Sequence, residues 1–377
     1  MLKRFSHTFT ILQRVVTSTY LLGSTISSPL PANAALPLPL HIQGTQVMNS
    51  NNQPVWLRGV DAASMEWTSD GQGHILTTIH VAVKDWHANI IRLPLSQDRW
   101  FGKAPGQQFK GKHYRALIQK IVHTCNSLGS YIILDMHWSD EGVWGNQIGQ
   151  HKMPDKNTLA FWKSFARVYR NYPGVLFDLY NEPHDISWQV WKYGGPVTEN
   201  DRKTGKSMTY RAVGMQTLLN AVRSTGAKNV VVAGGINWAY DMTGFLNGYQ
   251  LSDPNGNGVI YANHNYPFKG ETFAQWLKEM KTATAKIPVI VSEFGANPNP
   301  PSNTNFIWIR EVLQALESHH WNWTAWDMHP SASPDLINDW NYTPTSYFGI
   351  YVKEALDNTL PPYTAPPGAE NNPSTPQ

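Results

Sequence analysis

The stretch from Pro173 to Asp185, PGVLFDLYNEPHD, decides how the rest of the chain is interpreted. Its apolar, β-rich run from Val175 to Tyr180 predicts a fully buried strand. The strand ends abruptly in Asn-Glu-Pro, so that it delivers a carboxylate, Glu182, at its exit. Glu182 is then either a solvated loop residue, the commoner fate of a glutamate, or a catalytic carboxyl on the rim of a barrel.

A second carboxylate occupies the same kind of position much further along the chain. The run from Ile287 to Ser292, IPVIVS, predicts another buried strand, and Glu293 follows it directly. Two carboxylates at strand exits favour a catalytic interpretation of both, provided that the two exits meet in space.

The two ends of the chain differ in composition from its middle. Residues 1–34 combine early basic residues, a modestly apolar stretch and the cleavage signature Ala32-Asn33-Ala34, which predicts a secretory signal peptide cleaved after Ala34. The alternative is a poorly folded N-terminus, because Thr and Ser dilute the apolar stretch. Residues 361–377 are rich in Pro, Asn, Ser and Thr and predict a disordered tail. No linker interrupts residues 35–360, which we expect to form one domain.

Charge and aromatic content restrict the class of partner. The formal net charge is +3, but removal of the predicted signal peptide leaves 27 basic and 27 acidic residues, so no polyanion such as nucleic acid is expected as a partner. Trp and Tyr number 16 each, a composition that suits a neutral, hydroxyl-rich ligand stacked on rings. No other run is apolar and long enough to span a bilayer, so no membrane partner is expected. With the predicted signal peptide we expect a secreted protein, and we expect it to be a monomer.

The cysteine content excludes a disulfide scaffold. Cys125 is the single cysteine and shares a predicted helical face with Ile118, Ile121 and Val122. We therefore expect a core residue rather than a nucleophile.

Eight buried runs alternate with amphipathic helical patterns along the chain. This alternation predicts a (β/α)8 barrel preceded by a β-hairpin over residues 41–55 that turns at Asn49–Asn52. One of the helical patterns is expected over residues 208–225, after a long excursion that follows Glu182. The predicted strands cover residues 55–61, 89–94, 131–135, 175–180, 229–233, 259–262, 287–292 and 323–326.

Polar and aromatic residues gather at the exits of these predicted strands. An open sheet collects its site at one switch point, whereas a barrel brings all exits around one rim, so residues spread over six strands favour the barrel. These residues are Arg92, His137, Asn181, Glu182, His264, Tyr266, Glu293 and Trp326.

In this order the residues resemble glycoside hydrolase family 5, the cellulase-like retaining β-glycosidases, over about residues 41–360. That family has Arg after strand two, His after three, Asn-Glu after four, His-x-Tyr after six, Glu after seven and Trp after eight, and this chain matches every position. The resemblance implies that Glu182 is the acid/base and Glu293 the nucleophile, with carboxyl groups about 5 to 5.5 Å apart. It also implies that Asn181 binds the sugar 2-hydroxyl and that Trp326 stacks under the ring.

The residue types agree with these roles on physical grounds. Arg92 and the Tyr266 hydroxyl, if they lie near Glu293, would keep it ionised, whereas Glu182 must keep a proton for the leaving oxygen. His137 and His264 are interpreted as hydrogen-bonding residues of the same site. The alternatives are that Arg92 pairs with a structural carboxylate such as Asp135 and that the histidines are core residues. Their spacing is not that of metal ligands, so neither metal nor cofactor is expected.

The substrate is less well determined than the reaction. Similarity favours endo-acting cleavage of β-1,4-glucan, while an endo-β-mannanase or an exo-β-glucosidase of the same family remains open, as does a non-catalytic carbohydrate-binding barrel. Five tryptophans in loops after strands either line a cleft or pack beneath a loop. They are Trp67, Trp138, Trp188, Trp191 and Trp238.

Overall fold

The computed structural model describes residues 35–202, 204–269, 272–296 and 303–363, without the side chains of residues 303–305. The predicted signal peptide and all but the first three residues of the predicted tail lie outside this part of the chain. Among the described residues, no helix has the length and apolar character needed to cross a membrane.

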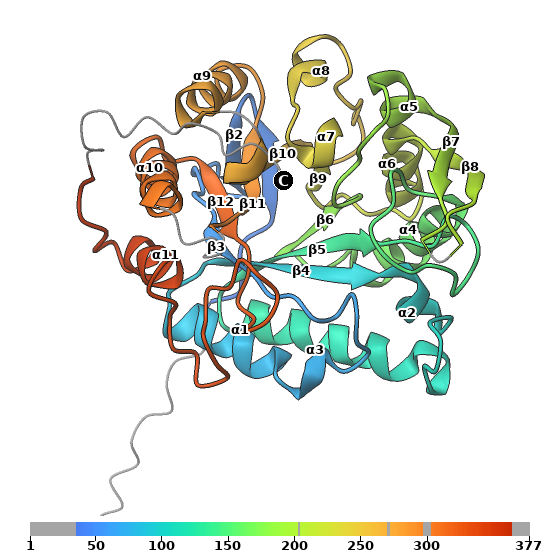
Figure 1. The fold of residues 1–377 in the computed structure, drawn as a ribbon, viewed down its shortest axis with the longest axis horizontal. Coiled ribbons are helices and arrows are strands. Elements are labelled where there is room, and N and C mark those ends of the chain that lie inside the picture. The colour runs from blue at the N-terminus through green and yellow to red at the C-terminus, as the bar shows by residue number, and fades with distance from the viewer. Residues whose placement is uncertain (1–34, 203, 270–271, 297–302, 364–377) are drawn as a thin grey trace, which may run out of the picture. The chain divides into compact units, whose positions relative to one another are not determined.

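Eight parallel strands close into a barrel and confirm the predicted (β/α)8 architecture (Figure 1). The last strand pairs with the first, since Trp323 lies opposite Arg58. Strands β5 and β10 run three residues beyond their predicted ends, which places His137 and His264 on the strands themselves. The strands are β3 (Arg58–Asp61), β4 (Ile90–Ser96), β5 (Tyr131–Trp138), β6 (Val175–Asp178), β9 (Val231–Gly234), β10 (Val259–Asn265), β11 (Val289–Phe294) and β12 (Asn322–Ala325).

Helices cover the outside of the barrel, and Figure 1 shows α1 and α3 side by side against β4 and β5. The longer helices are α1 (Ile75–Lys84), α3 (Lys112–Ser127), α4 (Lys156–Tyr169), α6 (Met215–Arg223), α9 (Phe273–Thr284), α10 (Asn303–Ser318) and α11 (Gly349–Leu356). Short turns of helix stand in the loops: α2 (Gln97–Phe101), α5 (Trp188–Tyr193), α7 (Ile236–Ala239), α8 (Thr243–Leu246), η1 (Gly71–Gly73), η2 (Phe109–Gly111) and η3 (Pro267–Lys269).

The apolar core has two parts. Ile90, Ile133 and Ile260 belong to a cluster of strand side chains on which Leu40 and Val47 of the N-terminal hairpin also pack. The larger part lies between strands and helices and contains Cys125, which is fully buried as predicted. Burial raises the pKa of the Cys125 thiol, which suits a core residue and not a nucleophile.

The N-terminal hairpin exists, but its predicted turn is wrong. Strands β1 (Leu40–Gln43) and β2 (Gln46–Asn49) are joined at Gly44, whose φ of 62° lies in the left-handed region that glycine adopts without cost. Asn49–Asn52 instead forms a second turn after β2, where the Asn49 side chain accepts the backbone N–H of Asn51. Residues Asn49–Asn52 therefore do form a turn, but this turn follows β2 and does not join β1 to β2.

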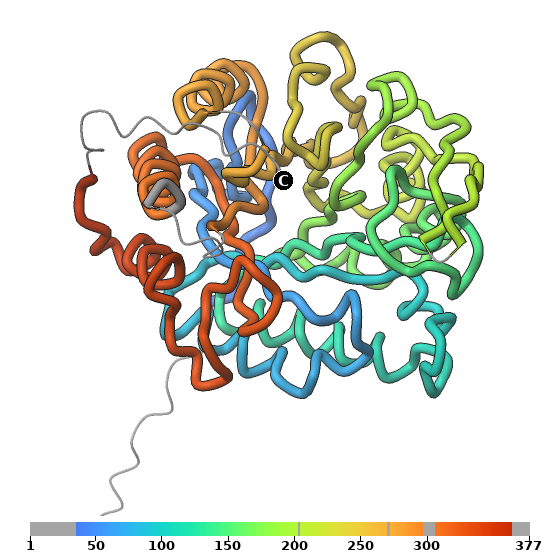
Figure 2. The backbone as a smooth tube through the Cα atoms, in the orientation of Figure 1, coloured from blue at the N-terminus to red at the C-terminus, as the bar shows by residue number. Residues whose placement is uncertain are grey.

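The predicted helix over residues 208–225 is also wrong in its first part. An antiparallel hairpin, β7 (Gly194–Asn200) and β8 (Ser207–Val213), occupies this segment, and α6 begins only after it. In β8 the alternate side chains of Tyr210 and Ala212 are buried, which is the two-residue period of a strand. Figure 2 shows this excursion in green, and β8 lies against α4.

Candidate active site

A cavity of about 720 Å³ lies at the carboxyl ends of the strands. Six of the eight residues predicted at strand exits line it: His137, Asn181, Glu182, Tyr266, Glu293 and Trp326. The barrel therefore brings together side chains that are up to 189 positions apart in the chain, His137 and Trp326.

Arg92 lies beneath this cavity, and the side chain is fully buried. One guanidinium nitrogen donates to Glu293 at 2.6 Å, and the other donates to the Asn181 amide oxygen at 2.7 Å and to the Asp178 carboxylate at 3.1 Å. Asp135 lies 3.1 Å away as well. Both alternatives for Arg92 are thus realised, because the same guanidinium binds the candidate nucleophile and the structural carboxylates.

The carboxyl groups around Arg92 outnumber its single positive charge. Burial raises the pKa of Asp178 to about 8 and that of Asp135 to about 7, although the charge of Arg92 acts in the opposite direction. The group beneath the cavity therefore retains protons near neutral pH.

Glu293 contacts both Arg92 and Tyr266, so the condition set for the two residues is met. Besides Arg92, the Tyr266 hydroxyl donates to its second oxygen at 2.9 Å. Burial and the neighbouring Glu293 charge raise the pKa of Tyr266 well above its ordinary value, so its hydroxyl stays protonated and remains a donor. A carboxylate held by a guanidinium and a hydroxyl is stabilised in its charged form.

Glu182 lies in different surroundings. Burial raises the pKa of its carboxyl, while the charge of nearby Lys269 lowers it. Its Oε1 lies 2.9 Å from Nδ1 of His264, which is also 3.4 Å from Glu293. Ligating atoms of these three residues all lie within 4.8 Å of one another, so the two glutamates face each other at short range.

His137 and His264 are both buried, and both are neutral near pH 7. Burial lowers the pKa of His137 to about 4 and that of His264 to about 3. Nδ1 of His137 donates to Asp135 at 2.5 Å, which leaves Nε2 as an acceptor 3.3 Å from the Asn181 amide nitrogen. These rings therefore orient polar groups and hold no charge of their own.

Asn181 is fixed on three sides. Its oxygen accepts from Arg92, and its amide nitrogen donates to the Gln150 side chain at 3.0 Å. Gln150 in turn donates to the backbone oxygen of Glu182 at 2.7 Å. The Asn-Glu pair is thereby held in one orientation at the exit of β6.

Trp326 and Trp238 present rings at the cavity. Trp326 stacks on His137 at 5.4 Å with 17° between the planes. Trp238 stacks on His184 at 4.6 Å, with the Lys269 amine 5.1 Å from its centroid. Trp238 and both its neighbours have positive φ, between 54° and 56°, a conformation costing on the order of 1–3 kcal/mol per residue. Trp238 lies in this strained turn and lines the cavity.

The other four tryptophans have different environments. Trp191 is fully buried and donates to Gly234 O at 2.8 Å, so its interpretation as an open subsite ring is wrong and the loop-packing alternative holds. Trp188 packs on Trp191, with ring centroids 5.2 Å apart, and so belongs to the same loop packing. Trp67 and Trp138 are half-buried and form a tilted pair at 6.2 Å, outside the lining of the cavity.

The cavity also contains residues that the sequence analysis missed. Phe268 is 60% exposed and stacks on Tyr266 at 5.2 Å, and Asn237 and Lys269 complete that side. The sequence pattern that could have identified them is weak, because Phe268 and Lys269 follow the His-x-Tyr motif at no characteristic spacing. The segment 327–347, for which no role was predicted, is anchored by Trp340, which stacks on His74 at 4.0 Å.

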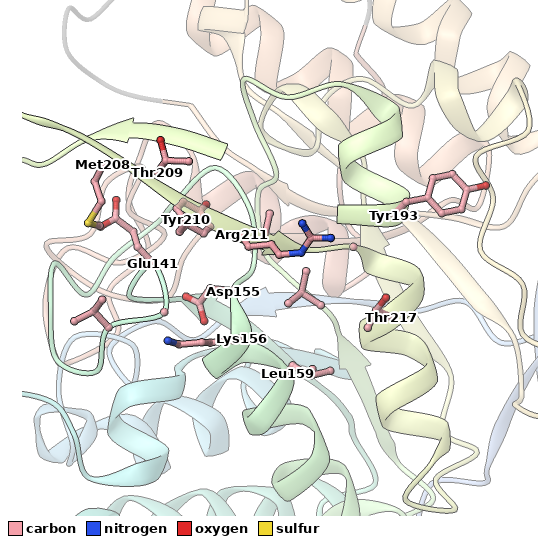
Figure 3. A pocket seen from close by; sticks show the side chains of 15 residues that line it. Glu141, Asp155, Lys156, Leu159, Tyr193, Met208, Thr209, Tyr210, Arg211 and Thr217 are labelled. Carbon is pink, nitrogen blue, oxygen red and sulfur yellow. The ribbon is translucent and has the colours of Figure 1, made fainter. Parts of the chain in front are cut away.

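A second hollow, of about 590 Å³, lies beside β8 and the start of α4 (Figure 3). The carboxylate of Asp155 at its edge is occupied in capping α4, where it accepts from the backbone N–H groups of Asn157 and Thr158. The facing carboxyl groups of Glu182 and Glu293 line the barrel cavity, so the barrel cavity is the candidate active site.

A (β/α)8 barrel with two carboxyl groups facing each other at the exits of its strands defines the class of the (β/α)8 glycoside hydrolases. The chain belongs to glycosyl hydrolase family 5, whose cellulase model matches residues 48–332. This finding confirms the resemblance drawn from the sequence.

Individual relatives are distant in sequence. The endoglucanase MaCel5A of Microbulbifer sp. (strain ALW1) is 23% identical over 76% of this chain and 50% of the relative, and endoglucanase E-5 of Thermobifida fusca is 21% identical over 76% and 55%. The chain thus spans about half the length of these curated relatives. The β-glucanase SdGluc5_26A of Saccharophagus degradans, solved in complex with cellotetraose, is 20% identical with a TM-score of 0.67, covering 90% of this chain and 100% of that one.

Proposed function

We propose that the protein is a retaining glycoside hydrolase that cleaves internal β-1,4 bonds of glucan, with Glu293 as nucleophile and Glu182 as acid/base. The observation that carries this proposal is the pair of facing carboxyl groups, with ligating oxygens within 4.8 Å, in unequal surroundings. Carboxyl groups about 5 to 5.5 Å apart leave no room for the water that an inverting enzyme places between them.

In the first step Glu293 attacks C1 of the sugar while Glu182 donates its proton to the leaving glycosidic oxygen. The C1–O bond breaks as the bond between C1 and the Glu293 oxygen forms, and the leaving chain departs with a hydroxyl. The raised pKa of Glu182 supplies the acid, and the Arg92 and Tyr266 contacts supply a charged nucleophile.

In the second step a water molecule loses its proton to Glu182 and attacks C1, which releases Glu293 as a carboxylate. Consumption of the Glu293 charge in the covalent intermediate removes a nearby negative charge and so makes Glu182 a carboxylate more readily. We assign Asn181 to the sugar 2-hydroxyl and Trp326 to stacking under the ring. Lys269, Trp238 and Phe268 border the same cavity.

The substrate class is supported by relatives that carry the names endoglucanase and β-glucanase. The test compares carboxymethylcellulose, glucomannan, mannan and xylan, with reducing-sugar release and viscosity measured together. We expect the viscosity of carboxymethylcellulose to fall early, before much reducing sugar appears, because internal bonds are cut.

Glu293→Gln is the matched control and should abolish both signals. Glucose as the only initial product would contradict endo action, and a preference for mannan would contradict the glucan assignment. Retention of substrate without bond cleavage would instead indicate a carbohydrate-binding barrel.

A further inference from the structure

Three side chains with metal-ligating atoms meet outside the candidate active site. Glu141 and His151 come from the loop between β5 and α4, and Glu199 comes from β7. Nδ1 of His151 lies 3.1 Å from a Glu199 oxygen and 3.5 Å from a Glu141 oxygen. One ligating atom of each residue lies within 4.8 Å of the others, and ligands of a tetrahedral zinc ion, with bonds of about 2.0–2.2 Å, lie about 3.3 to 3.6 Å apart, so the three atoms are close enough to share one ion.

The outer atom of each side chain is held by another group. Nε2 of His151 faces the backbone oxygen of Gln147 at 2.8 Å, which directs Nδ1 inward. The second oxygen of Glu199 accepts from the Tyr210 hydroxyl at 2.8 Å, and that of Glu141 accepts from the Gln147 side chain at 3.3 Å. Such outer partners orient metal ligands in proteins, and here they leave one atom of each residue for a common point.

The cluster is buried and carries excess negative charge. The side chains of Glu141 and His151 are 1% exposed and that of Glu199 is 11% exposed. Two buried carboxylates thus lie beside a single imidazole, and a divalent cation would compensate the charge of both. Asp201 and Arg202, of opposite charge, also face Glu141.

We propose that Glu141, His151 and Glu199 bind a divalent transition-metal ion of the Zn²⁺ class, with water completing the coordination shell. An imidazole with two carboxylates suits Zn²⁺, whereas Ca²⁺ and Mg²⁺ prefer ligand sets of oxygen alone. The ion ties the β5–α4 loop to the β7–β8 hairpin. Gln150, next to His151, contacts Asn181, so the same ion stiffens a wall of the candidate active site.

The test must separate this site from the catalytic cavity, where Glu182, His264 and Glu293 also bring ligating atoms together. The full chain carrying Glu293→Gln therefore serves as the background. After removal of metal by a chelator, we expect it to bind one equivalent of Zn²⁺ in titration calorimetry, with a rise in melting temperature. Ca²⁺ should have neither effect.

Addition of His151→Gln should weaken Zn²⁺ binding by about 100-fold or more and remove the rise in melting temperature. The matched control is His87→Gln, because His87 faces a single carboxylate, Asp357 at 2.7 Å, on the surface and should leave binding unchanged. Absence of Zn²⁺ binding in the background, equal binding by the His151→Gln variant, or preference for Ca²⁺ would overturn the proposal.

A second measurement needs no variant and covers the case in which His151→Gln does not fold. Crystals of the unaltered chain grown with Zn²⁺ should show an anomalous peak at the zinc edge between the three side chains. A peak confined to the catalytic cavity would refute the site.

Discussion

In the proposed catalytic pair, two residues of the same type differ only through what each carboxyl group contacts. Glu293 accepts from Arg92 and Tyr266, which stabilises a charge, whereas burial of Glu182 stabilises a proton. The proposed division of labour between nucleophile and acid therefore comes from the neighbours and leads to two predictions.

The first prediction is that Glu293→Ala and Glu182→Ala fail differently. Glu293→Ala should lose several orders of magnitude in kcat/KM on every substrate, because no nucleophile remains. Glu182→Ala should lose about 10²- to 10⁴-fold on oligosaccharides but retain activity on aryl glycosides with acidic phenols, which leave without a proton. Steady-state kinetics on cello-oligosaccharides and on a dinitrophenyl cellobioside measures both, and equal losses on both substrates would contradict the assignment.

The second prediction concerns pH and Lys269. Glu182 must be protonated to act as the acid, so the rate falls as pH rises through its pKa. The charge of Lys269 lowers that pKa, and its removal in Lys269→Met raises it. The alkaline limb of the kcat/KM profile should therefore move to higher pH.

The control for Lys269→Met is Lys192→Met. Lys192 likewise lies over an aromatic ring, 5.6 Å from the Tyr193 centroid, but it does not line the catalytic cavity. Its profile should match that of the unaltered protein. A limb that stays in place or moves to lower pH in Lys269→Met would refute the predicted coupling.

At the scale of elements, the start of α4 joins the helix to the barrel. Asp155 accepts from two backbone N–H groups of the helix and from the Gln97 side chain at 3.2 Å, and it is 1% exposed. Thr272 forms the same kind of capping box at α9, but on the surface. A comparison of Asp155 with Thr272 therefore separates the effect of burial on stability from the effect of capping.

The third prediction is that Asp155→Ala costs more stability than Thr272→Ala. We expect about 1 kcal/mol for Thr272→Ala, the usual cost of an N-cap. Asp155→Ala should cost about 2 to 4 kcal/mol, because the cap is lost and a buried Gln97 donor loses a partner as well. Urea unfolding followed by circular dichroism measures both, and equal costs would show that the buried contacts of Asp155 contribute nothing.

At the scale of the whole barrel, closure brings the exits of β6 and β11 to the same cavity. Glu182 follows β6 and Glu293 lies on β11, two strands that are not neighbours in the sheet, yet one oxygen of each lies within 4.8 Å of the other and of His264. This distance determines the stereochemistry that we expect.

The fourth prediction is that the reaction retains the anomeric configuration. Proton NMR of the first product, recorded before mutarotation, should show the β-anomer from a β-linked glucan. An α-anomer as the first product would mean that a water attacks C1 directly. It would refute the covalent intermediate even though the fold is that of the family.

The sequence by itself determined the order of the barrel strands and the strand ends at which the principal candidate site residues lie. Each strand overlaps its predicted range, because a buried parallel strand is a continuous apolar run that local sequence displays. The same local reasoning failed at two places, because two patterns of similar strength competed there. The hairpin turn was predicted at Asn49–Asn52 but lies at Gly44, and residues 208–213 were predicted as helix but form β8.

Only the tertiary structure decided which side chains meet. Arg92 contacts Glu293 across 201 positions of the chain, Gln150 holds Asn181 from another loop, and Lys269 reaches the surroundings of Glu182. Likewise, Trp191 is buried, an outcome that its position in a loop after a strand left open. The physical reason is that burial, charge and proton affinity depend on distances through space, and these are set by closure of the barrel and the packing of its loops.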